Sequence, residues 1–94
     1  MQDYAEAARW YRKAADQGDA GAQFDLGLMY CRGQGVTQDY AEAHMWLSLA
    51  ASRASGDDRK KYADARESVA KNMTQQQIVE AQHRAREWVP KAIR

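Results

Sequence analysis

The sequence predicts an all-α protein, a short α-solenoid of about five helices packed as antiparallel pairs into an α-α superhelix. The first observation behind this prediction is an internal repeat: residues 2–7 (QDYAEA) return unchanged 36 residues later, as residues 38–43. Over residues 2–17 against 38–53, nine of sixteen positions are identical. A period of this length is typical of stacked helical units that cannot bury their apolar faces alone. The second observation is the composition, with one proline, much alanine and no alternating strand pattern.

The first three helices follow from apolar periodicity and end signals. The helix that follows Asp3, its expected N-cap, carries apolar side chains on one broad arc and is expected to stop at Gly18. The helix that follows Asp39 repeats this pattern. Between them, residues 20–32 carry apolar side chains on two sides, so this helix needs a neighbour on each side. Gly27 lies in its middle at a cost of about 1 kcal/mol relative to alanine, so we expect another backbone to approach closely there.

The repeat fades in the last third of the chain, but the helical pattern continues. Asp57 or Asp58 is expected to cap a fourth helix. Thr74, with Gln77 three residues later, has the pattern of a capping box that begins a fifth helix, and Pro90 is expected to end it. The connecting turns are short, so each neighbouring pair of helices is expected to be antiparallel.

Charge and hydropathy limit the classes of function. The 14 basic and 13 acidic residues give a net charge of +1, which offers no overall field to attract nucleic acid or an anionic membrane. No apolar run approaches the roughly 20 residues that span a bilayer, and no signal peptide is visible. The single cysteine, Cys31, excludes an internal disulfide and is expected to be a small buried apolar residue.

Candidate catalytic and metal-binding residues are few. Glu80 and His83 have the helical spacing used in di-iron bundles, but that chemistry needs a second such motif and two more carboxylates. The only other histidine, His44, has no glutamate three residues before it. Gly33 and Gly35 follow a helix without the lysine of a phosphate loop, so they indicate a turn. We therefore predict a protein without catalysis, cofactor or metal ligands, and keep metal binding as a lesser alternative.

Basic residues in the C-terminal half leave an RNA-binding helical repeat as another alternative. They are interleaved with acidic residues, so no nucleic acid partner is expected. The three tryptophans lie on apolar stripes and are expected to pack in the core rather than to stack on a ligand. The basic residues are Arg59, Lys60, Lys61, Arg84, Arg86, Lys91 and Arg94, and the tryptophans are Trp10, Trp46 and Trp88.

The spacing of particular residues resembles that of a known family, the Sel-1-like repeat, a helix-turn-helix unit related to the tetratricopeptide repeat. The resemblance covers residues 18–52 as one complete repeat and residues 2–17 as the second helix of a preceding one. Residues 57–90 are similar to the helical pair that often closes bacterial members, so residues 1–94 are expected to form a single repeat domain. The residues that carry the resemblance to the repeat itself are Ala22, Leu26, Gly27, Tyr30, Gly33, Gly35, Val36, Asp39, Tyr40, Ala43, Trp46, Ala50 and Ala51.

The resemblance implies an adaptor or scaffold for protein–protein interaction, with a protein or peptide as partner. It also implies a bacterial protein, cytoplasmic or periplasmic. In such solenoids the first helix of each repeat lines a concave surface. On that helix Gln23, Asp25 and Arg32 lie outside both apolar stripes, as does Gly21, so we expect the three side chains to form a partner-facing edge.

The first helix presents an unusual solenoid end. Terminal repeats normally carry a polar outer face, but this helix carries Tyr4, Trp10 and Tyr11 on an arc too broad for one neighbour to cover. We expect these side chains to be partly exposed, in a chain that is a fragment of a longer array. Exposed apolar patches of this kind tend to be covered by another chain, so we also expect self-association through residues 4–15.

Overall fold

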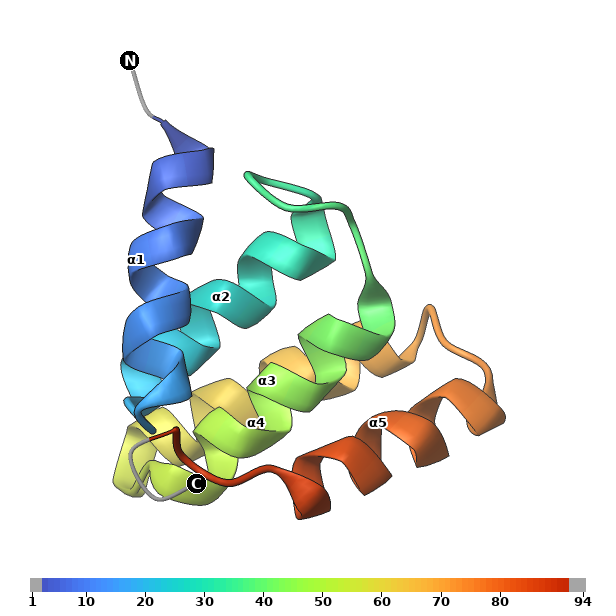
Figure 1. Ribbon diagram of the computed structural model, residues 1–94. Helices are drawn as coiled ribbons and strands as arrows, with labels where there is room; N and C mark the ends of the chain where they lie inside the picture. Colours follow the sequence, from blue (N-terminus) through green and yellow to red (C-terminus); the bar gives the residue numbers. More distant parts are fainter. Residues whose placement is uncertain (1–2, 92–94) are drawn as a thin grey trace.

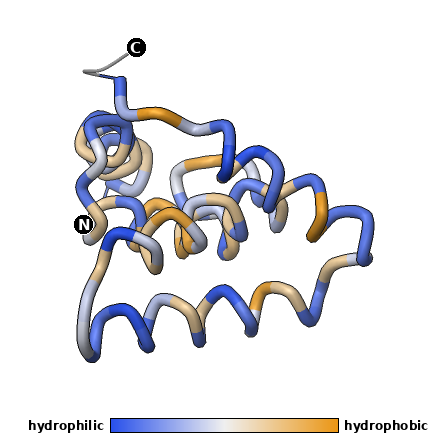
Figure 2. The backbone as a smooth tube through the Cα atoms, turned by 90° about the horizontal axis from the view of Figure 1, so that it is seen from below, coloured by the Kyte–Doolittle hydropathy of each residue, from blue (hydrophilic) through white to orange (hydrophobic). Residues whose placement is uncertain are grey.

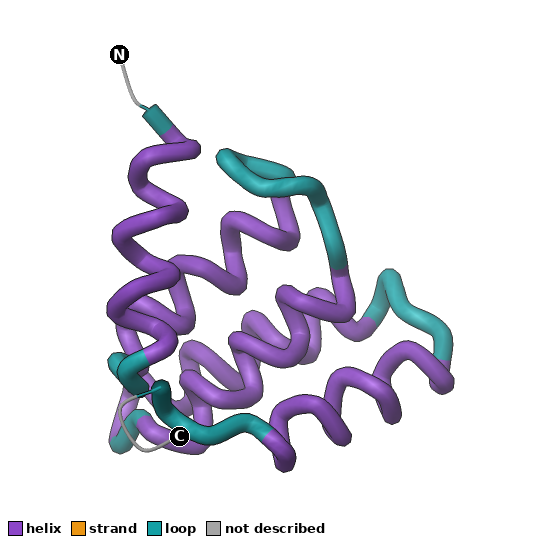
Figure 3. Tube along the Cα trace, viewed as in Figure 1, coloured by secondary structure: helices purple, strands orange, loops and turns teal. Residues whose placement is uncertain are grey.

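The computed structural model describes residues 3–91, and this part of the chain forms five α-helices and no strand (Figure 1). The all-α class and the short helical solenoid are therefore confirmed. The longest connection joins the second helix to the third and curls back toward the start of the first (Figure 3). The helices are α1 (Tyr4–Asp16), α2 (Ala20–Arg32), α3 (Tyr40–Arg53), α4 (Gly56–Ala70) and α5 (Gln75–Glu87).

Side chains satisfy the free N–H groups at the start of four helices. Asp3, Asp19 and Asp39 each accept a hydrogen bond from the backbone N–H three residues later, at 3.1, 3.0 and 3.1 Å. Thr74 and Gln77 form the complete capping box at the start of α5. The predicted caps at Asp3, Asp39 and Thr74 are confirmed, and each such cap contributes about 1 kcal/mol.

The start of α4 differs from the prediction. Its N-cap is Ser55, which makes no side-chain capping bond, and Asp57 and Asp58 lie inside the first turn. The prediction that one of these aspartates is the cap is therefore wrong. Their negative charges still favour this end of the helix because they lie near the positive end of the helix dipole.

The helix at the centre of the molecule is α3, which packs against α2, α4 and α5, whereas α1 packs against α2. In Figure 1, α4 lies behind α3 and α5 lies in front of it. The last two helices thus pack mainly on α3 rather than on each other, and they run in opposite directions on its two sides (Figure 1). The physical reason is that α3 is apolar on nearly every side. Its buried residues are Ala43, His44, Met45, Trp46, Leu47, Leu49, Ala50 and Ala51.

Helices α2 and α3 approach closely at Gly27. A Cβ atom placed there would lie 2.9 Å from Leu47 Cγ and 3.3 Å from the Ala43 carbonyl oxygen, both on α3. The expected close approach at this glycine is therefore confirmed. The contact brings α2 and α3 together along apolar stripes that include Leu26 and Trp46.

The C-terminal segment closes the molecule by returning to α1. After α5 the chain passes through Trp88, whose ring meets that of Trp46 edge-on at a centroid distance of 6.0 Å. The Lys91 N–H then donates to the Asp16 carbonyl oxygen at the end of α1, at 2.7 Å. Figure 3 shows this loop crossing below α3 to reach the end of α1.

Hydrophobic residues come in short stretches along the helices, interrupted by hydrophilic positions (Figure 2). Accordingly, no helix in residues 3–91 is both long enough and apolar enough to span a bilayer.

Replacing Gly27 with leucine should lower the free energy of unfolding by about 1–3 kcal/mol through overpacking against Leu47 and Ala43, although leucine is the better helix former. Urea unfolding monitored by circular dichroism measures this change. Gly21→Ala is the matched control because it replaces a glycine of the same helix where the nearest atom, an Asp19 carboxylate oxygen, is 3.4 Å away. The control should be neutral or slightly stabilising. Equal stability of the two variants would contradict a tight contact at Gly27.

The two tryptophans at equivalent repeat positions should differ sharply in their contribution to stability. Trp46→Ala should cost about 3–5 kcal/mol because the side chain is 1% exposed in the core. Trp10→Ala should cost less than about 1 kcal/mol because its ring is largely in solvent. Urea unfolding of both variants tests the pair, and similar losses would show that Trp10 also packs in the core.

Stability should fall as the pH drops below about 6.5, the ordinary pKa of histidine. Burial lowers the pKa of His44, the positive charge of Arg66 lowers it further, and Glu67 opposes the shift. The unfolded chain therefore takes up a proton at a higher pH than the folded chain, which favours unfolding. His44→Gln should reduce the loss of unfolding free energy between pH 7.5 and 5.5. The exposed residue His83 provides the control, and an equal reduction in His83→Gln would contradict the assignment to His44.

Candidate functional site

Gln23 is not at a partner-facing edge. Its side chain is 0% exposed, and its Nε2 donates at 3.1 Å to the Ala15 carbonyl oxygen in the last turn of α1. The last carbonyls of a helix lack partners within the helix, so this amide satisfies one of them. A fully buried side chain cannot contact a partner, so the prediction for Gln23 is wrong.

Asp25 and Arg32 line a hollow of about 290 Å³ between α1 and α2. Tyr4 and Tyr11, predicted for self-association, line the same hollow, so the structure brings together residues that the sequence assigned to two separate surfaces. Asp25 is half-buried and Arg32 is exposed. We call this cavity the α1–α2 hollow; it is lined by Tyr4, Ala7, Tyr11, Asp25, Leu28, Met29, Arg32 and Gln34.

The carboxyl group of Asp25 is the perturbed group of this hollow. Burial raises its pKa, the charge of Lys61 opposes the rise, and Asp19 adds to it. The ionised carboxylate is therefore less well solvated than at an open surface. A hydrogen-bond donor or cation supplied by a partner would stabilise it.

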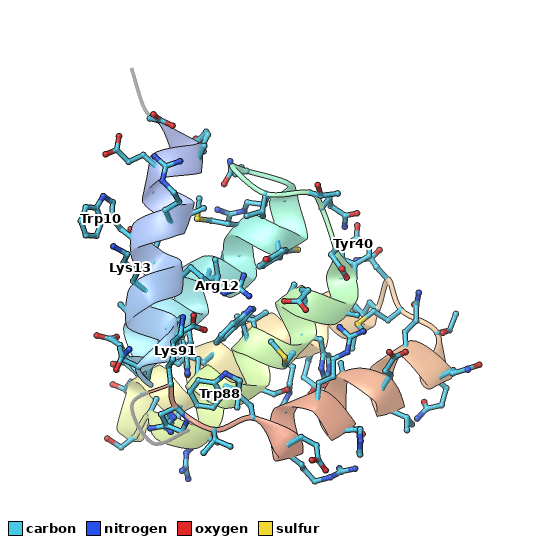
Figure 4. The ribbon with its side chains drawn as sticks, viewed as in Figure 1. Trp10, Arg12, Lys13, Tyr40, Trp88 and Lys91 are labelled. Atoms are coloured by element: carbon cyan, nitrogen blue, oxygen red, sulfur yellow. The ribbon has the colours of Figure 1, made fainter. Side chains whose placement is uncertain are left out.

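Trp10 lies outside the α1–α2 hollow and points away from the rest of the molecule (Figure 4). It is 63% exposed, and the Lys13 ammonium lies 5.0 Å from its ring centroid. Tyr4 and Tyr11 are 39% and 37% exposed, as expected for an uncovered outer face. The prediction of a core tryptophan is thus wrong for Trp10, because no described helix covers this side of α1, and right for Trp46.

Two further hollows share Arg12 and Lys13 on another side of α1, and the sequence analysis did not single them out. One, of about 390 Å³, has an apolar floor that includes Leu26 and Val36. The other, of about 510 Å³, extends to Lys91 in the C-terminal segment. We call the two together the basic hollow. Their charged lining residues are Arg9, Arg12, Lys13, Asp16 and Lys91, four basic groups against one acidic group.

Arg12 is held in place by three helices. Its Nη1 donates to the Tyr30 hydroxyl of α2 at 3.0 Å, and its Nε lies 3.6 Å from the Asp16 carboxylate of α1. Its guanidinium carbon lies 5.6 Å from the ring centroid of Trp46 on α3. Figure 4 shows Arg12 directed toward the other helices, with Trp88 and Lys91 nearby. A cation fixed by such contacts loses less side-chain freedom when it binds an anionic group.

Comparison with known families identifies the repeat. The model of the Sel1 repeat matches residues 1–19 and 20–55, which is more than half of the chain. The chain belongs to the Sel1 repeat family. No curated protein and no solved structure matches it. The matched Sel1 residues include α1, α2 and α3; the assignment of residues 57–90 as a closing pair stays a prediction.

The basic hollow of this Sel1 repeat chain could not be found from the sequence. Arg12 and Lys13 occupy the polar side of their helix, where charges are usually just solvated. Lys91 follows more than 70 residues later, and only the backbone hydrogen bond from Lys91 to Asp16 places it beside them. Pro90 indicated a helix end rather than a return to α1, and Lys91 stood out only as one of several scattered basic residues.

The residues considered for metal binding are otherwise engaged or apart. The Glu80 carboxylate pairs with Arg84 at 2.9 Å, and Arg84 also reaches Glu42 on α3 at 3.3 Å. Within residues 3–91, no three His, Cys, Asp or Glu side chains lie close enough together to hold a metal ion. Cys31 is a half-buried free thiol.

Proposed function

We propose that this chain is a protein–protein interaction scaffold with no catalysis of its own, and that it binds a protein or peptide partner through the basic hollow. The observation that carries the proposal is the excess of positive charge around an apolar floor. Arg9, Arg12 and Lys13 line the hollow that contains Leu26 and Val36, and the hollow that shares Arg12 and Lys13 with it adds Lys91 and one acidic group, Asp16. An acidic segment of a partner complements this surface, because opposite charge speeds encounter and sets register.

A comparison of the two repeat copies supports an open surface on this side of α1. In α3, Met45 and Leu49 are buried in one apolar cluster. Ala85, near the end of α5, and Trp88, just beyond α5, pack against this cluster. The equivalent residues 36 positions earlier are Arg9 and Lys13. Met45 and Leu49 of α3 are thus buried, whereas Arg9 and Lys13 of α1 are exposed. Charged side chains at these positions suit a surface that faces solvent or a partner.

The edge formed by Asp25 and Arg32 belongs to the same proposal as a second contact region. It offers one group of each charge beside the tyrosines of the α1–α2 hollow. Tyrosine and arginine are enriched among the residues that dominate interface energies.

An RNA-binding helical repeat is the second candidate. The observation that favours it is the exposed ring of Trp10 with the Lys13 ammonium 5.0 Å from its centroid, because a base can stack on such a ring while a cation contacts phosphate. Binding of this kind falls steeply with salt.

Reversing two charges of the basic hollow should weaken partner binding without unfolding the chain. Arg9→Glu with Lys13→Glu should lower the affinity for acidic peptides at least tenfold. Fluorescence anisotropy, with a library of labelled Asp- and Glu-rich peptides at 150 mM salt, measures the affinity. Lys71→Glu with Arg86→Glu is the matched control, because it changes the net charge equally at exposed positions, one just after α4 and one in α5, that do not line the hollow. Binding that is lost equally in both double variants, or in neither, would contradict the proposed site.

A labelled single-stranded RNA measured with the same proteins separates the two candidates. RNA binding that survives 150 mM salt and is lost in Trp10→Ala would favour the second candidate. Peptide binding that depends on Arg9 and Lys13, without such RNA binding, would favour the scaffold.

A further inference from the structure

A further hollow, of about 300 Å³, lies between α3 and α4. We call it the α3–α4 hollow; it is lined by Ser48, Ala51, Ser52, Arg59, Ala63 and Arg66. It shares no lining residue with the α1–α2 hollow or with the basic hollow. Two arginines and two serines supply its polar groups, and no acidic residue among the described ones lines it. This combination suits a bound anion.

The spacing of residues along the two helices brings these side chains together. Arg59, Ala63 and Arg66 are four and three residues apart, so they share one face of α4. Ser48 and Ser52 are four residues apart on the facing side of α3. The short side chain of Ala63 lies between the two arginines in sequence and leaves the space between their long side chains unfilled.

Each guanidinium group is held through its Nε atom. Arg59 Nε donates to the Ala51 carbonyl oxygen at 3.3 Å, and Arg66 Nε donates to the Glu67 carboxylate at 3.2 Å. Within residues 3–91 neither guanidinium group makes a further hydrogen bond. The two terminal nitrogens of each arginine therefore remain for another acceptor, and a guanidinium fork can bind an oxyanion through two parallel hydrogen bonds.

The positive charge of Arg66 outweighs the negative charge of its neighbour Glu67 inside the molecule. The Glu67 side chain is 66% exposed, whereas that of Arg66 is 31% exposed. Burial lowers the pKa of His44, and the charge of Arg66 lowers it further, by more than the charge of Glu67 raises it. The surroundings of the α3–α4 hollow thus carry a net positive potential.

Ser48 is the hydroxyl group best placed to add a third donor. Its Oγ lies 3.5 Å from His44 Nδ1, so the hydroxyl can accept from this ring nitrogen and still donate its own proton to an anion. Ser52 differs, because its hydroxyl already donates to the Leu49 carbonyl oxygen at 2.9 Å.

We propose that the α3–α4 hollow binds a phosphate monoester group, with the forks of Arg59 and Arg66 and the hydroxyl of Ser48 as donors. Such a group carries a charge of about −1.5 to −2 at pH 7 and three acceptor oxygens, so it can accept from all three donors at once. A carboxylate has one charge and two oxygens, so a single guanidinium fork satisfies it. The group belongs to a phosphorylated side chain of a protein or to a free phosphorylated metabolite. The proposal is independent of partner binding at the basic hollow.

Titrations followed by nitrogen-15 NMR at 150 mM salt test the site. The probes are methyl phosphate, acetate, and a blocked alanine peptide with one central serine, in its phosphorylated and unphosphorylated forms. Methyl phosphate should shift the amide signals of Ser48 and Ala63 and the Nε signals of Arg59 and Arg66. It should bind about tenfold or more tightly than acetate, because it bonds to both forks.

Removing both guanidinium groups should weaken binding while the fold stays intact by circular dichroism. Arg59→Gln with Arg66→Gln should lower the affinity for methyl phosphate by about tenfold or more. Lys60→Gln with Lys71→Gln is the matched control, because it removes the same charge at exposed positions in α4 and just after it that do not line the hollow. Arg66→Lys keeps the charge but lacks the fork, so it should also weaken binding.

The pKa of His44 gives a second readout that depends on the place of binding. A bound anion near Arg66 favours the protonated ring, so saturating methyl phosphate should raise this pKa, measured from the ring signals by NMR. The rise should occur in the parent chain and in the lysine control, and should be absent in Arg59→Gln with Arg66→Gln.

The outcomes separate the sources of the phosphate group. A phosphorylated peptide that binds about tenfold or more tightly than methyl phosphate, while its unphosphorylated form does not bind, supports a site for a modified protein. Equal affinities of the phosphorylated peptide and methyl phosphate support a site for a free metabolite. Methyl phosphate that binds no more tightly than acetate overturns the proposal, as does equal weakening in the arginine and lysine double variants.

Discussion

The absence of a side chain at Gly27 is the constraint on which the rest of the structure depends. It allows α3 to approach α2 until Leu47 and the Ala43 carbonyl lie against the α2 backbone. At this depth Trp46 reaches the cluster of Ala22 and Leu26 while other sides of α3 remain free for α4 and α5. The glycine weakens the helix by about 1 kcal/mol, and the apolar burial that it permits is several times larger. Helix α3 can pack against α2, α4 and α5 because α2 has no side chain at position 27, where α3 approaches it.

The same core supports the basic hollow. The ring of Trp46 lies between the guanidinium group of Arg12 and the edge of Trp88, and its Nε1 is buried with no hydrogen-bond partner in the part of the chain that the structure describes. A buried donor without a partner costs about 1–3 kcal/mol, so packing must outweigh that cost. The Tyr30 hydroxyl of α2 holds Arg12 near this ring, and the backbone hydrogen bond to Asp16 holds Lys91 at the end of α1. The charged surface is thus positioned by the largest fully buried side chain of the described residues.

The sequence predicts structural features that depend on residues close together in the chain. It does not predict features that depend on contacts between distant segments. The caps at Asp3, Asp39 and Thr74 follow from residues three positions apart, and the close approach at Gly27 follows from one residue in an apolar helix. Gln23 was misplaced because its polarity indicated solvent, whereas a carbonyl of α1 accepts its hydrogen bond. The packing of α4 and α5 on opposite sides of α3, and the return of Lys91 to Asp16, join segments whose proximity no local signal encodes.

The two copies of the repeated helix show that burial belongs to the surroundings and not to the residue. The segment QDYAEA precedes Trp10 as residues 2–7 and Trp46 as residues 38–43. Trp10 is nevertheless 63% exposed, whereas Trp46 is 1% exposed. A repeat therefore specifies which faces can be covered, and the presence of a neighbour decides which faces are covered. The positions at which the copies differ carry separate information, because Arg9 and Lys13 replace Met45 and Leu49 where a covering helix is lacking. Arg9 and Lys13 on one side of α1, together with the exposed Tyr4, Trp10 and Tyr11 on another, give a single helix two chemically different surfaces.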